Sequence, residues 1–245
     1  MKKQAMIGVG FASVLVLLAG TSFARGPGGG CGGGCTSTAD ASADSSVAAL
    51  SSEARAELLK MRQEEKLARD VYRALHERWG ADVFKISNSE QRHMDAMKAM
   101  LDRFSIQDPI VDDTPGVFTD KVFSDLYHEL VDAGSGSVLD ALKVGAKIEE
   151  LDLVDLRAAR AEAGDAVLDR VYGNLERATR NHLRAFAAQI EANKGVYAAV
   201  HLPQEEFDAI ADSEFERGNG GGAGQGQRKN AEQSREGCGR GGCGG

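Results

Sequence analysis

Between residues 50 and 217, apolar residues recur every three or four positions, which is the period of one face of an α-helix. Four long segments carry this pattern, and a shorter one lies between the second and the third. The sequence therefore predicts long helices over residues 52–79, 82–104, 137–162 and 165–193, and a short amphipathic helix over 120–133. Gly80 and the Gly164-Asp165 pair are typical of the places where helices end and begin.

The spacing of the four long helices predicts how they connect. The first and second are joined tightly, as are the third and fourth, whereas residues 105–136 separate the two pairs. Two antiparallel pairs joined by one long crossover form a known four-helix-bundle topology. Aromatic residues make up only 6% of the chain, which argues against a β-sandwich or barrel. We therefore expect an all-α fold, a four-helix bundle over residues 50–217 with a long crossover between its second and third helices.

Both ends of the chain are rich in glycine. Residues 25–49 contain Cys31 and Cys35, and residues 218–245 contain Cys238 and Cys243. Such segments have too few apolar residues to order themselves, so we expect disordered tails. The cysteine spacings match no standard zinc pattern. A thiol metal clip, disulfides that tie the tails and thiols that simply oxidise all remain open interpretations.

The first 24 residues have the pattern of an export signal. Lys2 and Lys3 precede an apolar run over residues 7–19, and Ser22-Phe23-Ala24 places small residues at a cleavage triplet. This predicts a periplasmic or secreted protein that has no membrane segment after cleavage. The formal net charge of -8 argues against a nucleic-acid partner, because such proteins usually present excess positive charge.

Six ionisable residues interrupt the inward-facing apolar stripes of the four long helices. They are Glu65 on the first, Glu90 and His93 on the second, Glu149 and Asp152 on the third, and His182 on the fourth. Burying these groups without compensation would cost several kcal/mol per charge. Bound divalent cations would neutralise them. Four carboxylates and two imidazoles suit two octahedral ions such as iron or manganese better than zinc.

The spacing of these residues supports a shared site, although alternatives exist. Glu90 and His93 form a Glu-x-x-His pair, which lies on one helix face. Glu90 could instead belong to a capping box that starts at Ser87, which would leave it near the surface. Asp152 could equally be an exposed helix charge. Glu64 and Glu150 compete with Glu65 and Glu149 for the inward position, and the stripe favours the latter two.

These motifs, in this order, resemble the ferritin-like diiron superfamily. More closely, the chain is similar to the family called domain of unknown function 2202. The stretches that carry the resemblance are EEKLARDVY (64–72), SEQRHMDAM (89–97), VGAKIEELDLVDL (144–156), RNHLRAF (180–186) and LPQEEFDAIADSEFERG (202–218).

The superfamily resemblance implies two bound iron ions, with manganese or zinc as alternatives. It also implies a reaction of Fe(II) with dioxygen or peroxide, of the ferroxidase or peroxidase kind. The chain departs from the superfamily at Thr179, where a glutamate usually precedes the histidine of the fourth helix. Asp152 could replace that carboxylate, or one metal could be bound weakly. A non-catalytic metal-binding protein and a metal-free helical interaction module remain alternatives, and a homodimer is compatible with each.

Overall fold

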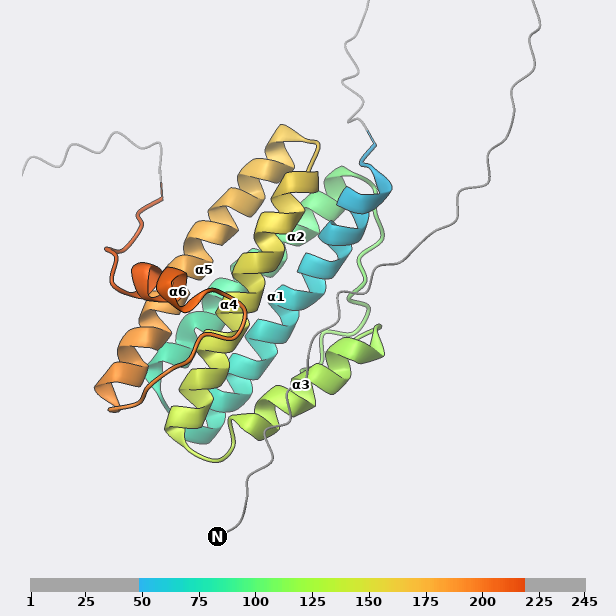
Figure 1. The fold of residues 1–245 in the computed structure, drawn as a ribbon. Coiled ribbons are helices and arrows are strands. Elements are labelled where there is room, and N and C mark those ends of the chain that lie inside the picture. The colour runs from blue at the N-terminus through green and yellow to red at the C-terminus, as the bar shows by residue number, and fades with distance from the viewer. Residues whose placement is uncertain (1–48, 219–245) are drawn as a thin grey trace, which may run out of the picture. The chain divides into compact units, whose positions relative to one another are not determined.

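The computed structural model describes residues 49–218, and every regular element within that range is helical (Figure 1). The elements are α1 (Ser52–Trp79), the 3₁₀ helix η1 (Asp82–Ile86), α2 (Ser87–Arg103), α3 (Lys121–Ala133), α4 (Val138–Glu162), α5 (Ala166–Ala192) and α6 (Gln204–Ala211). The expected all-α class is confirmed for these residues. The predicted export signal over residues 1–24 and all four cysteines lie outside the described residues.

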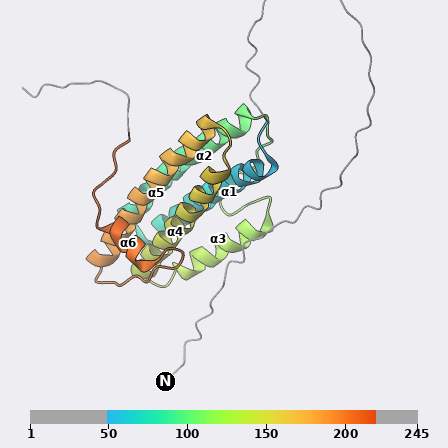
Figure 2. The same ribbon diagram turned by 45° about the horizontal axis from the view of Figure 1, so that its top comes forward.

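Helices α1, α2, α4 and α5 run alongside one another in both views (Figures 1 and 2). Helix α1 packs against α2, α4 packs against α5, and the two pairs meet through contacts of α1 with α4 and of α2 with α5. The connection from α2 to α4 contains α3, which packs against α1 and α4. Helix α6 packs against α5.

Side-chain caps explain most of the helix starts. Ser51, Asp120, Ser137 and Asp165 each accept a hydrogen bond from a backbone N–H in the first turn of the following helix. Gly80 ends α1 with a φ of 65°, a conformation that glycine adopts without strain. These local signals explain why the observed bounds of α1, α3, α4 and α5 lie close to the predicted ones.

The second long helix differs from the prediction. Residues 82–86 form a 3₁₀ turn, and the α-helix begins only at Ser87, with no side-chain cap. Glu90 nevertheless remains 2% exposed, so it faces the interior. Helix α6 was not predicted, because eight residues with buried Phe207 and Ile210 are too short to show a helical period clearly.

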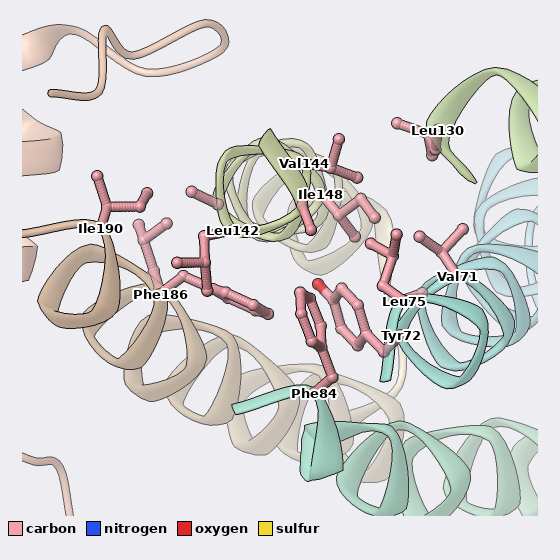
Figure 3. Close-up of a cluster of buried hydrophobic side chains, with 14 of the residues drawn as sticks. Val71, Tyr72, Leu75, Phe84, Leu130, Leu142, Val144, Ile148, Phe186 and Ile190 are labelled. Atoms are coloured by element: carbon pink, nitrogen blue, oxygen red, sulfur yellow. The ribbon is translucent and has the colours of Figure 1, made fainter. Parts of the chain in front are cut away.

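Two apolar clusters fill the space between the helices. One contains Tyr72, Phe84, Leu142 and Phe186 (Figure 3), and the other contains Met61, Met97, Leu156 and Leu168, among other residues. Glu65 on α1 and His182 on α5 each fall between that helix's contributions to the two clusters, and α2 places Glu90 and His93 between Phe84 of the first cluster and Met97 of the second. The apolar clusters therefore flank the polar centre and separate it from the ends of the helices.

One apolar cluster depends on a glycine. The rings of Tyr72, Phe84 and Phe186 lie together, with the centroids of Tyr72 and Phe186 5.3 Å apart (Figure 3). A methyl group at Gly145 would overlap the Phe186 ring. The absence of a side chain on α4 therefore lets Phe186 pack beside Tyr72.

We expect Gly145→Ala to destabilise the fold by about 1–3 kcal/mol, because an added methyl group in a well-packed core forces its neighbours to shift. Gly173→Ala is the matched control on α5, since its methyl group would only touch the flexible Arg160 side chain at 3.4 Å. There the higher helix propensity of alanine should dominate and stabilise by about 0.5–1 kcal/mol. Urea unfolding of both variants measures the difference, and equal stabilities would contradict this packing.

A buried ionic network attaches the α2–α4 connection to α1. Lys66, Arg69 and Asp70 are each fully buried, and Asp70 contacts Lys66 at 2.5 Å and Arg69 at 2.8 Å. Arg69 also reaches Asp113 at 2.6 Å, and Asp70 accepts a hydrogen bond from the Gly116 N–H. These contacts hold residues 113–116 against the middle of α1.

Glu150 holds the segment that precedes α6. Its Oε2 accepts hydrogen bonds from the backbone N–H groups of Val200, His201 and Leu202 at 2.7–2.9 Å. The sequence favoured Glu149 over Glu150 for the inward position, but Glu150 is fully buried under this segment.

None of the helices within residues 49–218 combines the length and the apolar character needed to cross a lipid bilayer.

Candidate metal centre

Four helices contribute buried ligand-type side chains to the middle of the fold. Glu65 comes from α1, Glu90 and His93 from α2, Glu149 from α4 and His182 from α5. All are 9% exposed or less. Because residues i and i+3 share a helix face, α2 directs both Glu90 and His93 inward.

The five side chains form two overlapping groups. In the first, His93 Nδ1 lies 3.2 Å from Glu65 Oε2 and 2.7 Å from Glu90 Oε2. In the second, His182 Nδ1 lies 2.9 Å from Glu90 Oε1 and 3.4 Å from Glu149 Oε2. Glu90 therefore belongs to both groups and offers one oxygen to each. The two imidazole rings lie nearly parallel, with centroids 5.5 Å apart.

Several of these atoms converge without bonding to one another. Glu90 Oε1 and His182 Nδ1 are 2.9 Å apart, yet their relative orientation does not give a hydrogen bond, and neither atom forms another hydrogen bond within residues 49–218. Glu65 Oε1 also lacks a partner there. A buried polar atom without a partner costs about 1–3 kcal/mol. Within each group the ligand atoms lie within 4.8 Å of one another, so a cation placed among them would satisfy all of them.

The charges within the centre depend strongly on one another. Burial raises the pKa of Glu65 to about 7, although His93 opposes the rise. Burial also acts to raise the pKa of Glu90, but the charges of His182 and His93 hold it well below its ordinary range. Burial acts to lower the pKa of His182, yet Glu90 and Glu149 raise it to about 10. Without a metal, protons on the imidazoles thus balance part of the carboxylate charge.

Hydrogen bonds from neighbouring side chains orient two of the ligands. The Tyr72 hydroxyl is fully buried and donates to Glu149 Oε1 at 2.6 Å. Burial raises the pKa of Tyr72 well above its ordinary value, so the hydroxyl keeps its proton. Ser89 Oγ lies 3.4 Å from His93 Nε2, on the opposite side of the ring from the carboxylates. Tyr72 lies on the same helix as Glu65, but its hydrogen bond reaches across to Glu149 on α4.

Asp152 lies beside the two groups and belongs to neither. Its Oδ2 accepts a hydrogen bond from Thr179 Oγ1 at 2.6 Å, and its buried Oδ1 has no partner within the described residues. Burial, followed by the charges of Glu65 and Glu149, raises the pKa of Asp152 well above its ordinary value. The structure therefore gathers the other predicted ligands and leaves Asp152 hydrogen-bonded to the threonine that departs from the superfamily pattern.

A surface groove of about 590 Å³ reaches His182 from outside. Its lining includes Ser89, Arg92, Asn181 and Phe215. Glu216 holds the Phe215 segment in place through ion pairs with Arg180 and Arg184 on α5. The groove provides access to the histidine side of the centre for a small molecule.

Comparison with known proteins places the chain in a family. Residues 54–214 match the family model described as "Uncharacterized protein domain (DUF2202)". The "Uncharacterized protein MJ0754" of Methanocaldococcus jannaschii is 43% identical over 170 residues, which cover 69% of this chain and 92% of that protein. The crystal structure of hypothetical protein MJ0754 from Methanococcus jannaschii DSM 2661 is similar with a TM-score of 0.68 at 42% identity, over 69% of this chain and 98% of that one. The expected resemblance to domain of unknown function 2202 is confirmed: the chain belongs to the DUF2202 family.

Proposed function

We propose that the chain is an exported, ferritin-like diiron protein that reacts with Fe(II) and dioxygen or peroxide, as a ferroxidase or a peroxidase-like enzyme. The observation that carries this proposal is the position of Glu90, whose two carboxylate oxygens each lie within 3 Å of a different histidine. A carboxylate shared in this way suits a pair of metal ions held close together. The side-by-side packing of α1, α2, α4 and α5 supports a ferritin-like four-helix bundle with a long crossover.

The ligand set supports two similar metal positions despite the missing glutamate at Thr179. Each group has one histidine, one oxygen of Glu90 and one further carboxylate. The further carboxylate is Glu65 in the first group and Glu149 in the second. Thr179 stands where a second shared carboxylate would be expected, yet each position keeps its own ligands, and Asp152 lies beside the centre in a hydrogen bond with Thr179.

The surrounding residues orient a ligand of the centre, exclude water from it and leave one side accessible, which suits redox chemistry. Iron bound there would supply one-electron oxidation and reduction, with open positions for the oxidant. Tyr72 fixes the orientation of Glu149, and the two apolar clusters exclude bulk water along the helix axes. The groove beside His182 leaves one side accessible. Carboxylate and imidazole ligands also permit manganese or zinc.

Turnover with Fe(II) tests the catalytic part of the proposal. We expect the purified chain to consume dioxygen or hydrogen peroxide over many cycles when Fe(II) is supplied, as measured with an oxygen electrode and a peroxide assay. Zinc loaded first should block this reaction by occupying the same ligands. A chain that binds iron but consumes neither oxidant would instead be a non-catalytic metal-binding protein.

Metal binding should release protons at neutral pH. The pKa of His182 is raised to about 10 and that of His93 lies well above its ordinary value, so both imidazoles are protonated at pH 7. A metal ion requires the neutral imidazoles and the ionised form of Glu65, whose pKa is about 7, so we expect at least two protons to leave per filled centre and the apparent affinity to rise with pH. Calorimetry in two buffers with different ionisation enthalpies measures the release. Binding heats that do not depend on the buffer would contradict it.

The export part of the proposal is supported by the signal pattern over residues 1–24. We expect the protein isolated from its cells to begin after Ala24. Sequencing of the amino terminus checks this, and a chain that retains Met1 and is found in the cytoplasm would contradict export.

A further inference from the structure

The groove beside His182 is far larger than dioxygen or hydrogen peroxide requires. Its volume is about 590 Å³, which lies within the range of sites that hold drug-sized organic molecules. A water molecule takes up only about 30 Å³ in the liquid, and the two small oxidants are little bigger than water. The groove therefore has room for an organic substrate at the histidine side of the centre.

The ring of His182 is shared between the groove and the centre. Its Nδ1 is buried and lies 2.9 Å from Glu90 Oε1 and 3.4 Å from Glu149 Oε2. The side chain is 11% exposed, so its exposed area belongs to other atoms than Nδ1, and the residue lines the groove. Ser89, which lies 3.4 Å from His93 Nε2, lines the groove as well. A molecule in the groove therefore contacts one ligand of the centre directly and reaches the other histidine through one side chain.

Apolar side chains from three separate segments also line the groove. They are Val83 and Ile86 of η1, Ala178 and Ala185 of α5, and Phe215 from the segment that follows α6. Ala178, His182 and Ala185 are spaced i, i+4 and i+7, so small apolar residues flank the histidine on one face of α5. The apolar body of an organic molecule would thus find contacts immediately beside the histidine.

Glu216 anchors the wall of the groove that Phe215 forms. Its carboxylate lies 2.6 Å from the guanidinium groups of both Arg180 and Arg184. Its backbone N–H donates to Asn181 Oδ1 at 2.9 Å, and Asn181 Nδ2 donates to its backbone oxygen at 3.0 Å. The hydrogen bond from Arg180, followed by that from Arg184, lowers the pKa of Glu216 to about 2, although burial opposes the shift. The carboxylate therefore stays ionised at neutral pH and keeps Phe215 at the groove.

The groove also presents an uncompensated positive charge. Arg92 of α2 lines it, is exposed, and forms no ion pair or hydrogen bond with any other residue of the described part of the chain. Lys85 and Asp82, which line the groove too, pair with each other at 2.7 Å. A free guanidinium suits a carboxylate, because it can donate two parallel hydrogen bonds to the two oxygens.

We propose that this groove binds an organic hydroperoxide with an apolar body and a carboxylate group, and that this hydroperoxide is the oxidant that the centre reduces. This inference rests on the proposed function of the centre. The apolar body packs against Phe215 and Ile86, the carboxylate pairs with Arg92, and the peroxide end lies beside His182. Reduction breaks the O–O bond: the hydroperoxide takes up two protons and two electrons, one from each of two Fe(II) ions, and leaves as an alcohol and water.

Binding to the metal-free full chain tests the groove without turnover. The probe is para-carboxy cumyl alcohol, which has the shape and charge of para-carboxy cumene hydroperoxide but no peroxide bond. We expect calorimetry to detect binding, and Arg92→Gln and Phe215→Ala each to weaken it about threefold to fivefold, because exposed ion pairs and partly exposed apolar contacts contribute modestly. The controls Arg170→Gln and Val196→Ala change exposed residues outside the groove and should bind as wild type does. No binding by wild type, or equal losses in the controls, would overturn the site.

The preference among peroxides tests the substrate class. With Fe(II) supplied, we expect kcat/KM for para-carboxy cumene hydroperoxide to exceed that for hydrogen peroxide about tenfold, because only the larger substrate gains contacts along the groove. Arg92→Gln should remove its advantage over uncharged cumene hydroperoxide, whereas Arg170→Gln should preserve it. Hydrogen peroxide reduced as efficiently as the carboxylated peroxide would overturn the substrate class while the proposed function stands. A chain that binds the alcohol in the groove but consumes no oxidant would instead refute the proposed function.

Discussion

Glu90→Gln should remove metal from both halves of the centre, because its two oxygens face His93 and His182 separately. Glutamine keeps the shape of the side chain but offers only one oxygen and no charge. We expect the affinity for both ions to fall at least about 100-fold, a larger effect than loss of a residue that merely orients a ligand. Elemental analysis of the purified full chain, after loading with Fe(II) and desalting, measures the metal per chain.

The comparison variants separate the two halves. His93→Ala and Glu149→Ala each remove a ligand from one group only, so each should lower the bound metal by about half or more. Asp95→Asn is the control on α2, since Asp95 is exposed on the opposite face from Glu90. Full metal occupancy in Glu90→Gln, with native circular dichroism, would show that the shared carboxylate is assigned wrongly.

Asp70→Asn should cause the largest loss of stability among single polar changes on α1. Asp70 is fully buried between Lys66 and Arg69, and it also accepts the Gly116 N–H. Removing its charge leaves two buried cations short of a partner, which costs about 3–5 kcal/mol. Urea unfolding of the metal-free chain measures the change.

Asp113→Asn provides the matched comparison for this network. The Asp113 side chain is 63% exposed, so its ion pair with Arg69 is screened by water and should contribute about 1 kcal/mol or less. We also expect Asp70→Asn to speed proteolysis within residues 105–120, because that segment loses its attachment to α1. Equal stabilities of the two variants would refute the importance of the buried pairings.

The sequence predicted the parts of the fold that local signals specify. Helices α1, α3, α4 and α5 appear because each has a clear period of 3.6 and because Ser51, Asp120, Ser137 and Asp165 cap them in turn. The convergence of Glu65, Glu90, Glu149 and the two histidines follows from their places on the inward stripes. These signals are local, so they can be read without knowledge of distant contacts.

The sequence could not reveal contacts that depend on distant segments. Lys66 and Asp70 form an i,i+4 pair that looks like an ordinary solvated helix surface, but residues 113–116 cover them. The apolar stripe placed Glu65 rather than Glu64 in the inward position, yet the Glu64 side chain is only 11% exposed. The reason is that α1 packs against α2, α3 and α4, so more than one of its faces is buried. A single apolar stripe therefore describes α1 poorly.

The most direct test of the account is anomalous diffraction at the iron edge from crystals of the Fe(II)-loaded chain. We predict two peaks separated by a few ångströms, one beside His93 and Glu65 and the other beside His182 and Glu149, with Glu90 between them. A crystal that contains iron but shows no peak within reach of Glu90 would contradict the central claim.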